Sequence, residues 1–223
     1  MFLAANTNND EAIKIPWRIK EWFPDLSEKT LTTLRSYFDL IVKHNKTLSL
    51  ISPKTVPVAD ALHFADCILG SQIVLEDSPG IKHIYDFGSG NGFPGVVFGI
   101  LHPEIQVTLV ESDLRKVEFL RHVCDTLSIG NVKVLHAGFE TLPQDSVKFA
   151  IVRGFGNISK TILLARKIMP KGGVLYHMKG EQWGLEITEI PTQLCSIFFP
   201  ALVREYVLPA TQIRFGVVKT TKN

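Results

Sequence analysis

The fold of this chain is decided by the run Ile84-Tyr85-Asp86-Phe87-Gly88-Ser89-Gly90-Asn91-Gly92-Phe93-Pro94-Gly95. An apolar segment ends at a carboxylate, four glycines follow within eight residues, and a helix-like segment comes next. This order is typical of a parallel β-strand that turns sharply into its crossover helix. Glycines permit positive φ in such a turn and let a ligand lie close to the backbone. The N–H groups of the turn and of the helix start favour a polar or anionic ligand group.

Two cofactor patterns compete for this run. Gly90-x-Gly92-x-x-Gly95 fits the dinucleotide pattern, which arises by chance in many sequences. Asp86-x-Gly88-x-Gly90-x-Gly92 fits the acidic residue and glycines of enzymes that use S-adenosylmethionine (AdoMet). The register favours this second pattern, because Asp86 stands just before the turn and can accept hydrogen bonds from a ligand amine or position the loop. A turn alone rarely requires four glycines.

The composition excludes a strongly basic protein. The chain has 223 residues, of which 45% are apolar and 21% charged, and its formal net charge is +2. This suffices for one large domain or a domain with an appendage, with a sizeable core. Residues 1–80 carry 8 Lys and Arg against 10 Asp and Glu, and residues 81–223 carry 16 against 12. A polyanion would therefore meet local basic patches.

Cysteine usage and hydropathy indicate a cytoplasmic protein without a membrane partner. Cys67, Cys124 and Cys195 are far apart and show no metal-ligand spacing, which indicates reduced, mostly buried thiols. No apolar run approaches the ~20 residues that span a bilayer. Residues 1–10 lack the basic start of a signal peptide, and we expect this start to be flexible.

The sequence before residue 76 is helical in texture and predicts an N-terminal helical cap over residues 1–75. Apolar residues recur at three- and four-residue spacing over 26–42, which marks one buried helix face. The stretch 44–53 breaks this period, and Pro57 can open another helix, which Gly70 and the turn residues 76–80 end. We expect the aromatic cluster of Trp17, Trp22 and Phe23 to dock the helices on the sheet.

Residues 76–223 predict a second, α/β domain. Strands are expected at 81–87, 106–110, 132–136, 147–152 and 174–178, with helices at 96–101, 114–127, 158–169 and 181–190. Residues 197–207 and 213–219 can pair as a terminal hairpin. The alternation predicts a Rossmann-like, mainly parallel sheet with helices on both faces. Such sheets bind ligands beyond the carboxyl ends of their strands, where the strand order reverses.

Candidate ligand residues follow three of these strands. Glu111 closes the second strand, where a carboxylate can hold two ribose hydroxyls. Phe139 and Glu140 follow the third, where an apolar side chain and backbone groups can pack on and pair with an adenine ring, although Phe139 fits a core position equally well. Arg153 ends the fourth, where a guanidinium can grip a ligand carboxylate or an RNA phosphate, or form a surface ion pair.

The segment around Arg153 also indicates which chemistry is missing. Enzymes that methylate exocyclic amines usually carry an Asn/Asp-Pro-Pro-aromatic motif here, whereas this chain reads Val152-Arg153-Gly154-Phe155. Cytosine C5 methylation needs a cysteine nucleophile, and none of the three cysteines sits at a strand end beside a proline. A ring nitrogen such as guanine N7 has a lone pair ready to attack a sulfonium methyl group. Alignment and desolvation then carry the catalysis.

At this point the chain resembles the glucose-inhibited division protein B family, AdoMet-dependent methyltransferases of guanine N7 in bacterial small-subunit ribosomal RNA. The run 86–95 is similar to the family's D-V-G-T-G-x-G-[FL]-P-G loop, and the Phe-Pro-Gly ending is more specific than the glycines. The resemblance spans most of the chain. Residues 45–50 resemble N-K-x-x-N-L, 63–67 R-H-x-x-D-S, 111–120 D-S-x-x-K-R-x-x-F-L, 153–155 S-R-A-F and 178–180 L-K-G.

The resemblance implies an antiparallel last strand and a set of cofactor contacts, and the sequence shows no spacing that predicts a metal site. Together with the residues argued above, the expected cofactor site comprises Asp86, Gly88, Gly90, Phe93, Glu111, Phe139, Glu140 and Arg153. Asn45, Lys179 and Arg214 are expected on the RNA or guanine side, and no residue is assigned as a catalytic base. The expected partner is small-subunit ribosomal RNA or the assembling small subunit, bound by a monomer.

The chain departs from the family pattern at four positions. Leu62 and Gly138 replace arginines, Ser49 replaces an asparagine, and Val152 replaces a serine. Cofactor binding is expected to survive these changes, while RNA affinity and the choice of nucleotide are left open. The alternatives are an AdoMet-dependent methyltransferase of another RNA or a small molecule, a nicotinamide-dependent oxidoreductase, and a non-catalytic RNA-binding module.

Overall fold

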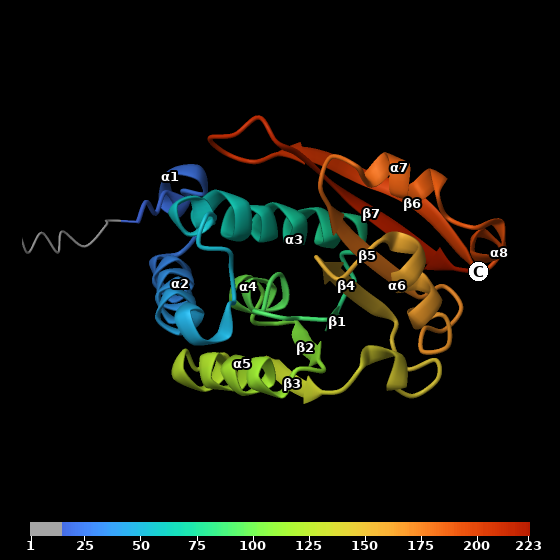
Figure 1. The fold of residues 1–223 in the computed structure, drawn as a ribbon, viewed down its shortest axis with the longest axis horizontal. Helices are drawn as coiled ribbons and strands as arrows, with labels where there is room; N and C mark the ends of the chain where they lie inside the picture. The colour runs from blue at the N-terminus through green and yellow to red at the C-terminus, as the bar shows by residue number, and fades with distance from the viewer. Residues whose placement is uncertain (1–14) are drawn as a thin grey trace, which may run out of the picture.

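A single sheet forms the centre of the molecule (Figure 1). The computed structural model describes residues 15–223, so the expectation of a flexible start at residues 1–10 lies outside the described residues. The strand order is β3-β2-β1-β4-β5-β7-β6. The strands are β1 His83–Phe87, β2 Gln106–Glu111, β3 Val132–His136, β4 Phe149–Arg153, β5 Val174–Lys179, β6 Phe198–Val207 and β7 Arg214–Lys222.

This topology confirms the predicted Rossmann-like α/β sheet. Strands β1 to β5 are parallel. The terminal hairpin is also confirmed, with β7 antiparallel to both β5 and β6. The strand order reverses between β1 and β4, which are direct neighbours. The carboxyl ends of these two strands, at Phe87 and Arg153, therefore border the crevice where such a sheet takes a ligand.

Two hydrophobic cores lie on the two faces of the sheet, because successive strand residues point to opposite sides. Ile151 belongs to one core, whereas its neighbours Ala150 and Val152 belong to the other. The first core lies under α1 Ile19–Trp22, α2 Glu28–Leu48, α3 Asp66–Asp77, α4 Gly95–Leu101 and α5 Leu114–Thr126. The second lies under η3 Phe139–Thr141, α6 Ile158–Ala165, α7 Trp183–Thr188 and α8 Thr192–Cys195 (Figure 1).

The helices before β1 differ from the sequence prediction in two places. The apolar period breaks at residue 44, but α2 continues to Leu48. Its polar residues Lys46 and Thr47 face solvent in the last turn, where apolar side chains are not needed. Gly70, predicted to end the next helix, lies inside α3. Glycine is needed at this position because a Cβ there would come 2.4 Å from the Met178 Cε atom. This glycine lets α3 pack closely on β5.

The segment that leads into α3 is almost continuously helical. Pro57 lies in η1 Val56–Val58, as an opening proline should, and η2 Asp60–Ala65 then joins directly to α3. Trp17 packs against Phe38 of α2 and Phe64 of η2, at ring-centroid distances of 5.3 and 4.8 Å. This tryptophan of the expected aromatic cluster therefore joins the first helices to one another within the core that covers the sheet.

Helix α6 is shorter than the range 158–169 predicted for it. The carbonyls of Lys167 and Ile168 accept hydrogen bonds from Asp145 and Val147, in the segment before β4. After Ala165 the chain forms a turn in which the N–H groups of Ile168 and Met169 both donate to the Ala165 carbonyl. Among residues 15–223, no helix is long and apolar enough to cross a membrane.

Candidate active site

The glycine run forms a tight loop between β1 and α4. Gly88, Gly90 and Gly92 have φ values of 66°, 58° and 97°, which glycine adopts at little cost. The N–H of Gly88 donates to the carbonyl of Val110 at 2.9 Å, so the start of the loop is fixed against the end of β2. A Cβ on Gly92 would lie 2.5 Å from the Tyr37 hydroxyl, which leaves no room for a side chain.

Asp86 is fully buried at the end of β1. Its Oδ2 accepts a hydrogen bond at 3.0 Å from the N–H of Gly95, the first residue of α4. Its Oδ1 is buried and has no partner among the described residues. Burial raises the pKa of Asp86 to about 7, although the Gly95 N–H opposes this shift. A ligand ammonium beside Oδ1 would favour the charged form.

Glu111 closes β2, as predicted, and its carboxylate is largely buried. Oε2 accepts from the Gly90 N–H at 2.7 Å, and Oε1 accepts from the N–H groups of Ser112 and Asp113 at 2.8 Å each. Glu111 thus pins the middle of the glycine loop to the neighbouring strand. Because each carboxylate oxygen can accept two hydrogen bonds, Oε2 retains one acceptor position for a ligand hydroxyl.

The helices before β1 clamp the far side of the glycine loop. The hydroxyl of Tyr37 on α2 donates to the carbonyl of Asn91 at 2.6 Å. The Asn91 amide donates in turn to the carbonyl of Leu50 at 2.8 Å. Phe93 is buried and stacks on His63, with ring centroids 5.3 Å apart at 14°. The loop therefore takes its shape from both β2 and the helical segment.

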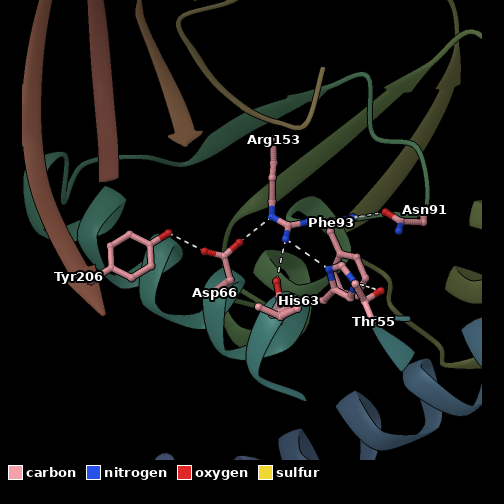
Figure 2. A network of polar contacts seen from close by, with 8 residues as sticks. Thr55, His63, Asp66, Asn91, Phe93, Arg153 and Tyr206 are labelled. Atoms are coloured by element: carbon pink, nitrogen blue, oxygen red, sulfur yellow. Dashed lines mark hydrogen bonds and ion pairs between the residues drawn. The ribbon is translucent and has the colours of Figure 1, made fainter. Parts of the chain in front are cut away.

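Arg153 lies at the centre of a polar network that joins three parts of the chain (Figure 2). Its Nε donates to Oδ2 of the fully buried Asp66 at 2.6 Å. Its Nη2 donates to the carbonyl of Leu62 at 2.8 Å and lies 3.3 Å from Nδ1 of His63. The surface ion pair considered from the sequence is thus a largely buried one, with a side-chain exposure of 20% for Arg153. Nη1 has no partner among the described residues and is not enclosed, so one edge of the guanidinium faces outward.

The charges in this network follow from the geometry. Burial alone would lower the pKa of Arg153, but the charge and the hydrogen bond of Asp66, together with the nearby Cys67 and Tyr206, outweigh burial and the pKa lies above its ordinary value. Burial, helped by the charge of Arg153, lowers the pKa of His63 to about 3. Because Arg153 donates to Nδ1, the imidazole proton is assigned to Nε2, 3.1 Å from the Thr55 hydroxyl. His63 is therefore neutral at pH 7 with both ring nitrogens engaged.

Among the members of this network that were not predicted as site residues, His63, Asp66 and Tyr206 have ionisable side chains. His63 and Asp66 lie three residues apart and therefore share one helical face. Both belong to the run 63–67, which resembles the family segment R-H-x-x-D-S. Tyr206 on β6 donates to Oδ1 of Asp66 at 2.7 Å, from a position 140 residues away in the chain. No local pattern signals a partner at that separation.

Aromatic residues border the loop on the other face of the sheet. Phe139 stacks on Phe87 with centroids 4.3 Å apart and is 3% exposed, so its side chain belongs to the second core. Its contact with adenine, and that of the exposed Glu140, stays a prediction. Phe155 meets Phe139 edge to face at 5.1 Å, and its ring lies 2.5 Å from where a Cβ of Gly88 would be. An aromatic ring therefore covers the first glycine of the loop.

The residues predicted on the RNA side have three different surroundings. Lys179 ends β5 and pairs with Glu186 at 2.8 Å. Arg214 begins β7, is exposed, and forms no ion pair with another described residue. Asn45 lies in the last turn of α2, where its amide bonds both backbone groups of Ile51 at 2.9 and 3.0 Å. Asn45 thus closes the loop that follows α2.

The four departures from the family pattern are structurally mild. Leu62 serves the guanidinium network through its backbone carbonyl alone. Ser49 ends α2 with a left-handed φ of 50°. A Cβ on Gly138 would meet only the end of the flexible Glu140 side chain, at 2.5 Å. Val152 packs in the second core. The glycine loop contains none of these positions.

A cavity of about 630 Å³ lies elsewhere, between the start of α2, the end of α4 and the segment after α5. None of the predicted site residues lines it. Within residues 15–223, no three His, Cys, Asp or Glu side chains gather to hold a metal ion. The candidate site is the end of the sheet beyond β1 and β4, where the glycine loop and Arg153 lie.

Comparisons with known proteins agree with this geometry. Solved structures share the fold: an O-methyltransferase from Bacillus cereus in complex with SAH has a TM-score of 0.59 at 12% identity and covers 93% of this chain and 98% of its own. A SAM-dependent methyltransferase from Aquifex aeolicus has a TM-score of 0.56 at 14% identity, covering 76% of this chain and 98% of its own.

Sequence relatives give the family. A Bdellovibrio bacteriovorus protein named ribosomal RNA small subunit methyltransferase G 3 is 53% identical over 216 residues, which cover 96% of this chain and 98% of that protein. A Jannaschia protein named ribosomal RNA small subunit methyltransferase G is 31% identical, covering 77% of this chain and 82% of its own. The family model described as GidB, rRNA small subunit methyltransferase G, matches residues 30–201. The chain therefore belongs to the rRNA small subunit methyltransferase G family, whose members depend on AdoMet.

Proposed function

We propose that this chain transfers the methyl group of AdoMet to N7 of a guanine in small-subunit (16S) ribosomal RNA. The observation that carries the proposal is the set of residues at the carboxyl ends of β1 and β4. There the left-handed glycines, the half-paired carboxylate of Asp86 and the free edge of Arg153 belong to neighbouring strand ends. The names of the relatives support the RNA class.

The residues of the crevice fit the polar groups of AdoMet. Nη1 of Arg153 is a free cationic donor for the carboxylate, and Oδ1 of Asp86 is a buried acceptor for the ammonium. Oε2 of Glu111 keeps an acceptor position for a ribose hydroxyl. Gly88 and Gly90 leave the backbone open to close approach. When bound, AdoMet supplies the electrophilic sulfonium methyl group. The proposed cofactor site keeps the remaining predicted members, Phe93, Phe139 and Glu140.

Guanine N7 suits this site because its lone pair needs no general base. His63, the imidazole nearest to Arg153, is neutral and both of its nitrogens are engaged. The chain then contributes alignment of the lone pair with the methyl group, and exclusion of water. The ring of Phe155 over Gly88 gives the crevice an apolar wall for this purpose.

The RNA side of the proposal uses Lys179, Arg214 and the helical segment that carries Asn45. We propose that residues 1–75 form a cap on a catalytic domain of residues 76–223. We also propose that the protein acts as a monomer in the cytoplasm, on small-subunit ribosomal RNA or the assembling subunit.

The direct test is transfer of label from methyl-labelled AdoMet to small-subunit ribosomal RNA, naked and within the subunit. Label that maps to N7-methylguanine, detected by borohydride and aniline cleavage, is the expected result. An Arg153→Lys variant keeps a charge beside Asp66 but loses the forked donor. It should transfer methyl roughly tenfold more slowly or worse, the effect of losing one charge-assisted hydrogen bond.

Three outcomes contradict the proposal in different ways. If AdoMet binds but neither RNA form accepts methyl, the cofactor site stands and the substrate is another RNA or a small molecule. The departures at Leu62, Ser49 and Gly138 then become the leading explanation. If Arg153→Lys transfers methyl at the full rate, the role of Arg153 is wrong. RNA binding with strong salt dependence and no transfer would indicate a binding module.

A further inference from the structure

Tyr206 is the one member of the Arg153 network that comes from the terminal hairpin. Its hydroxyl donates to Oδ1 of Asp66 at 2.7 Å, while the other oxygen of the same carboxylate takes Nε of Arg153 at 2.6 Å (Figure 2). Asp66 is fully buried, and these two groups divide its carboxylate between them. The tyrosine and the arginine are therefore connected through one side chain.

This division decides which edge of Arg153 stays free. An arginine and a carboxylate readily form two parallel hydrogen bonds. Tyr206 donates to Oδ1 and Nε of Arg153 donates to Oδ2, while Nη2 donates to the carbonyl of Leu62 and Nη1 has no partner among the described residues. Without the hydroxyl, Oδ1 would be a buried carboxylate oxygen without a partner. The carboxylate would then turn toward Arg153 and alter its orientation.

Tyr206 also links this network to the exposed end of the hairpin. It pairs with Phe215 across β6 and β7, and the two rings stack at 6.0 Å and 27°. The adjacent pair in the register is Val207 with Arg214, the exposed arginine predicted to face RNA. Two hydrogen bonds thus connect Arg153, expected on the cofactor side, with Tyr206, whose register pair lies next to that of Arg214, the arginine expected on the RNA side.

We propose that Tyr206, acting through Asp66, is a positioning residue for Arg153 and joins the terminal hairpin to the cofactor site. The inference rests on the proposed contact of Arg153 with AdoMet. Tyr206 is a donor that does not change with pH, since burial, with the nearby Asp66, raises its pKa far above the ordinary value.

The chain offers a matched control for this hydrogen bond. Tyr176 on β5 donates to Oδ2 of Asp77 at 2.7 Å, and Oδ1 of Asp77 pairs with Lys219 at 2.6 Å. This second tyrosine, aspartate and cation set has the same chemistry but contains none of the predicted site residues. Tyr206→Phe and Tyr176→Phe therefore each remove a tyrosine–aspartate hydrogen bond, and Tyr176→Phe also removes the 2.6 Å bond with the Ser78 hydroxyl.

The experiment measures the Kd for AdoMet by calorimetry, together with the urea midpoint of each variant. Tyr206→Phe should raise the Kd roughly 3- to 10-fold, within the range for residues of one network, whereas Tyr176→Phe should change only the midpoint. In an Arg153→Lys background the effect of Tyr206→Phe on the Kd should disappear. A merely structural role predicts the same fold-change in both backgrounds and would overturn the inference.

The remaining outcomes are also decisive. An unchanged Kd for Tyr206→Phe, in a protein whose parent binds AdoMet and methylates RNA, overturns this inference and leaves the proposed function standing. A parent that binds no AdoMet overturns both. If Tyr206→Phe does not fold, Phe215→Leu tests the same connection by loosening the stack on Tyr206, and an unchanged Kd there overturns the inference.

Discussion

At the scale of single residues, the protonation of the buried Asp86 is coupled to folding. Its folded pKa of about 7 lies above its ordinary value of 3.8, with burial as the main cause. Between these two values the folded chain holds a proton that the unfolded chain has released. This contribution to stability is therefore fully present below about pH 4 and is lost as the pH rises through 7.

An Asp86→Asn variant should lack this pH dependence. Between pH 5 and 8, the free energy of unfolding of the parent should fall by on the order of 2 kcal/mol more than that of the variant. Urea unfolding at each pH, without AdoMet, measures the difference. Asp125→Asn, at an exposed carboxylate, is the control and should follow the parent. Parallel curves for the parent and Asp86→Asn would contradict a buried, half-paired carboxylate.

Gly88 tests the glycine loop one residue at a time. A Gly88→Ala side chain would adopt a φ of 66° and place its Cβ 2.5 Å from the Phe155 ring. The left-handed backbone should cost about 1–3 kcal/mol of stability, and the shifted loop should bind AdoMet more weakly. Gly130→Ala, where nothing lies within 4 Å of the new Cβ, is the matched control. Equal urea midpoints for the two variants would show that the loop tolerates a side chain.

At the scale of elements, the strands were predictable and the helix ends were not. Parallel strands buried on both faces are apolar throughout, so a single sequence locates them. Helix ends involve residues distant in the chain. Gly70 is a position inside α3 where the Met178 side chain leaves no room for a Cβ, so it is not a helix end. Helix α6 ends just before Lys167, whose carbonyl accepts a hydrogen bond from Asp145. The candidate site likewise has a part that local sequence predicts and a part that depends on distant contacts.

The local part of the site was predictable and the network behind it was not. Asp86, the glycines and Glu111 follow from one strand-turn-helix pattern and a neighbouring strand end. The buried pairing of Arg153 with Asp66, 87 residues apart, and the bond from Tyr206 depend on how the elements assemble. Sequence periodicity contains no information on contacts at that separation.

Asn45 gives the element-scale prediction, because the structure shows it holding the end of α2. Asn45→Ala removes both hydrogen bonds to Ile51 and should cost about 1–3 kcal/mol of unfolding free energy. The exposed neighbour Thr47→Ala, which loses one local bond to a helix carbonyl, should cost much less. Urea unfolding measures both, and filter binding measures RNA affinity separately. A stable Asn45→Ala protein with impaired RNA binding would instead place this side chain at the RNA surface.

At the scale of the whole molecule, the Asp66–Arg153 pair joins α3, β4 and, through Tyr206, β6. Removing one partner of a buried ion pair leaves an uncompensated charge, so Asp66→Ala should cost about 3–5 kcal/mol of stability. Asp39→Ala breaks an exposed pair with Arg35 and should cost less than about 1 kcal/mol. Both are read from urea midpoints. A small effect at Asp66 would mean that the three elements are held together without this network.

The balance of charge over the molecule predicts how the proposed RNA binding responds to salt. Arg214 is exposed at the hairpin end. Lys82 is exposed just before β1, at the opposite end of that strand from the glycine loop. Each substitution to alanine removes one positive charge, so a general field effect would be equal for the two. If Arg214 touches a phosphate, Arg214→Ala should reduce the slope of log K against log salt by about 1. Lys82→Ala should leave the slope unchanged. Titrations of small-subunit ribosomal RNA at several salt concentrations give these slopes, and equal slopes for both variants would place the RNA elsewhere on the surface.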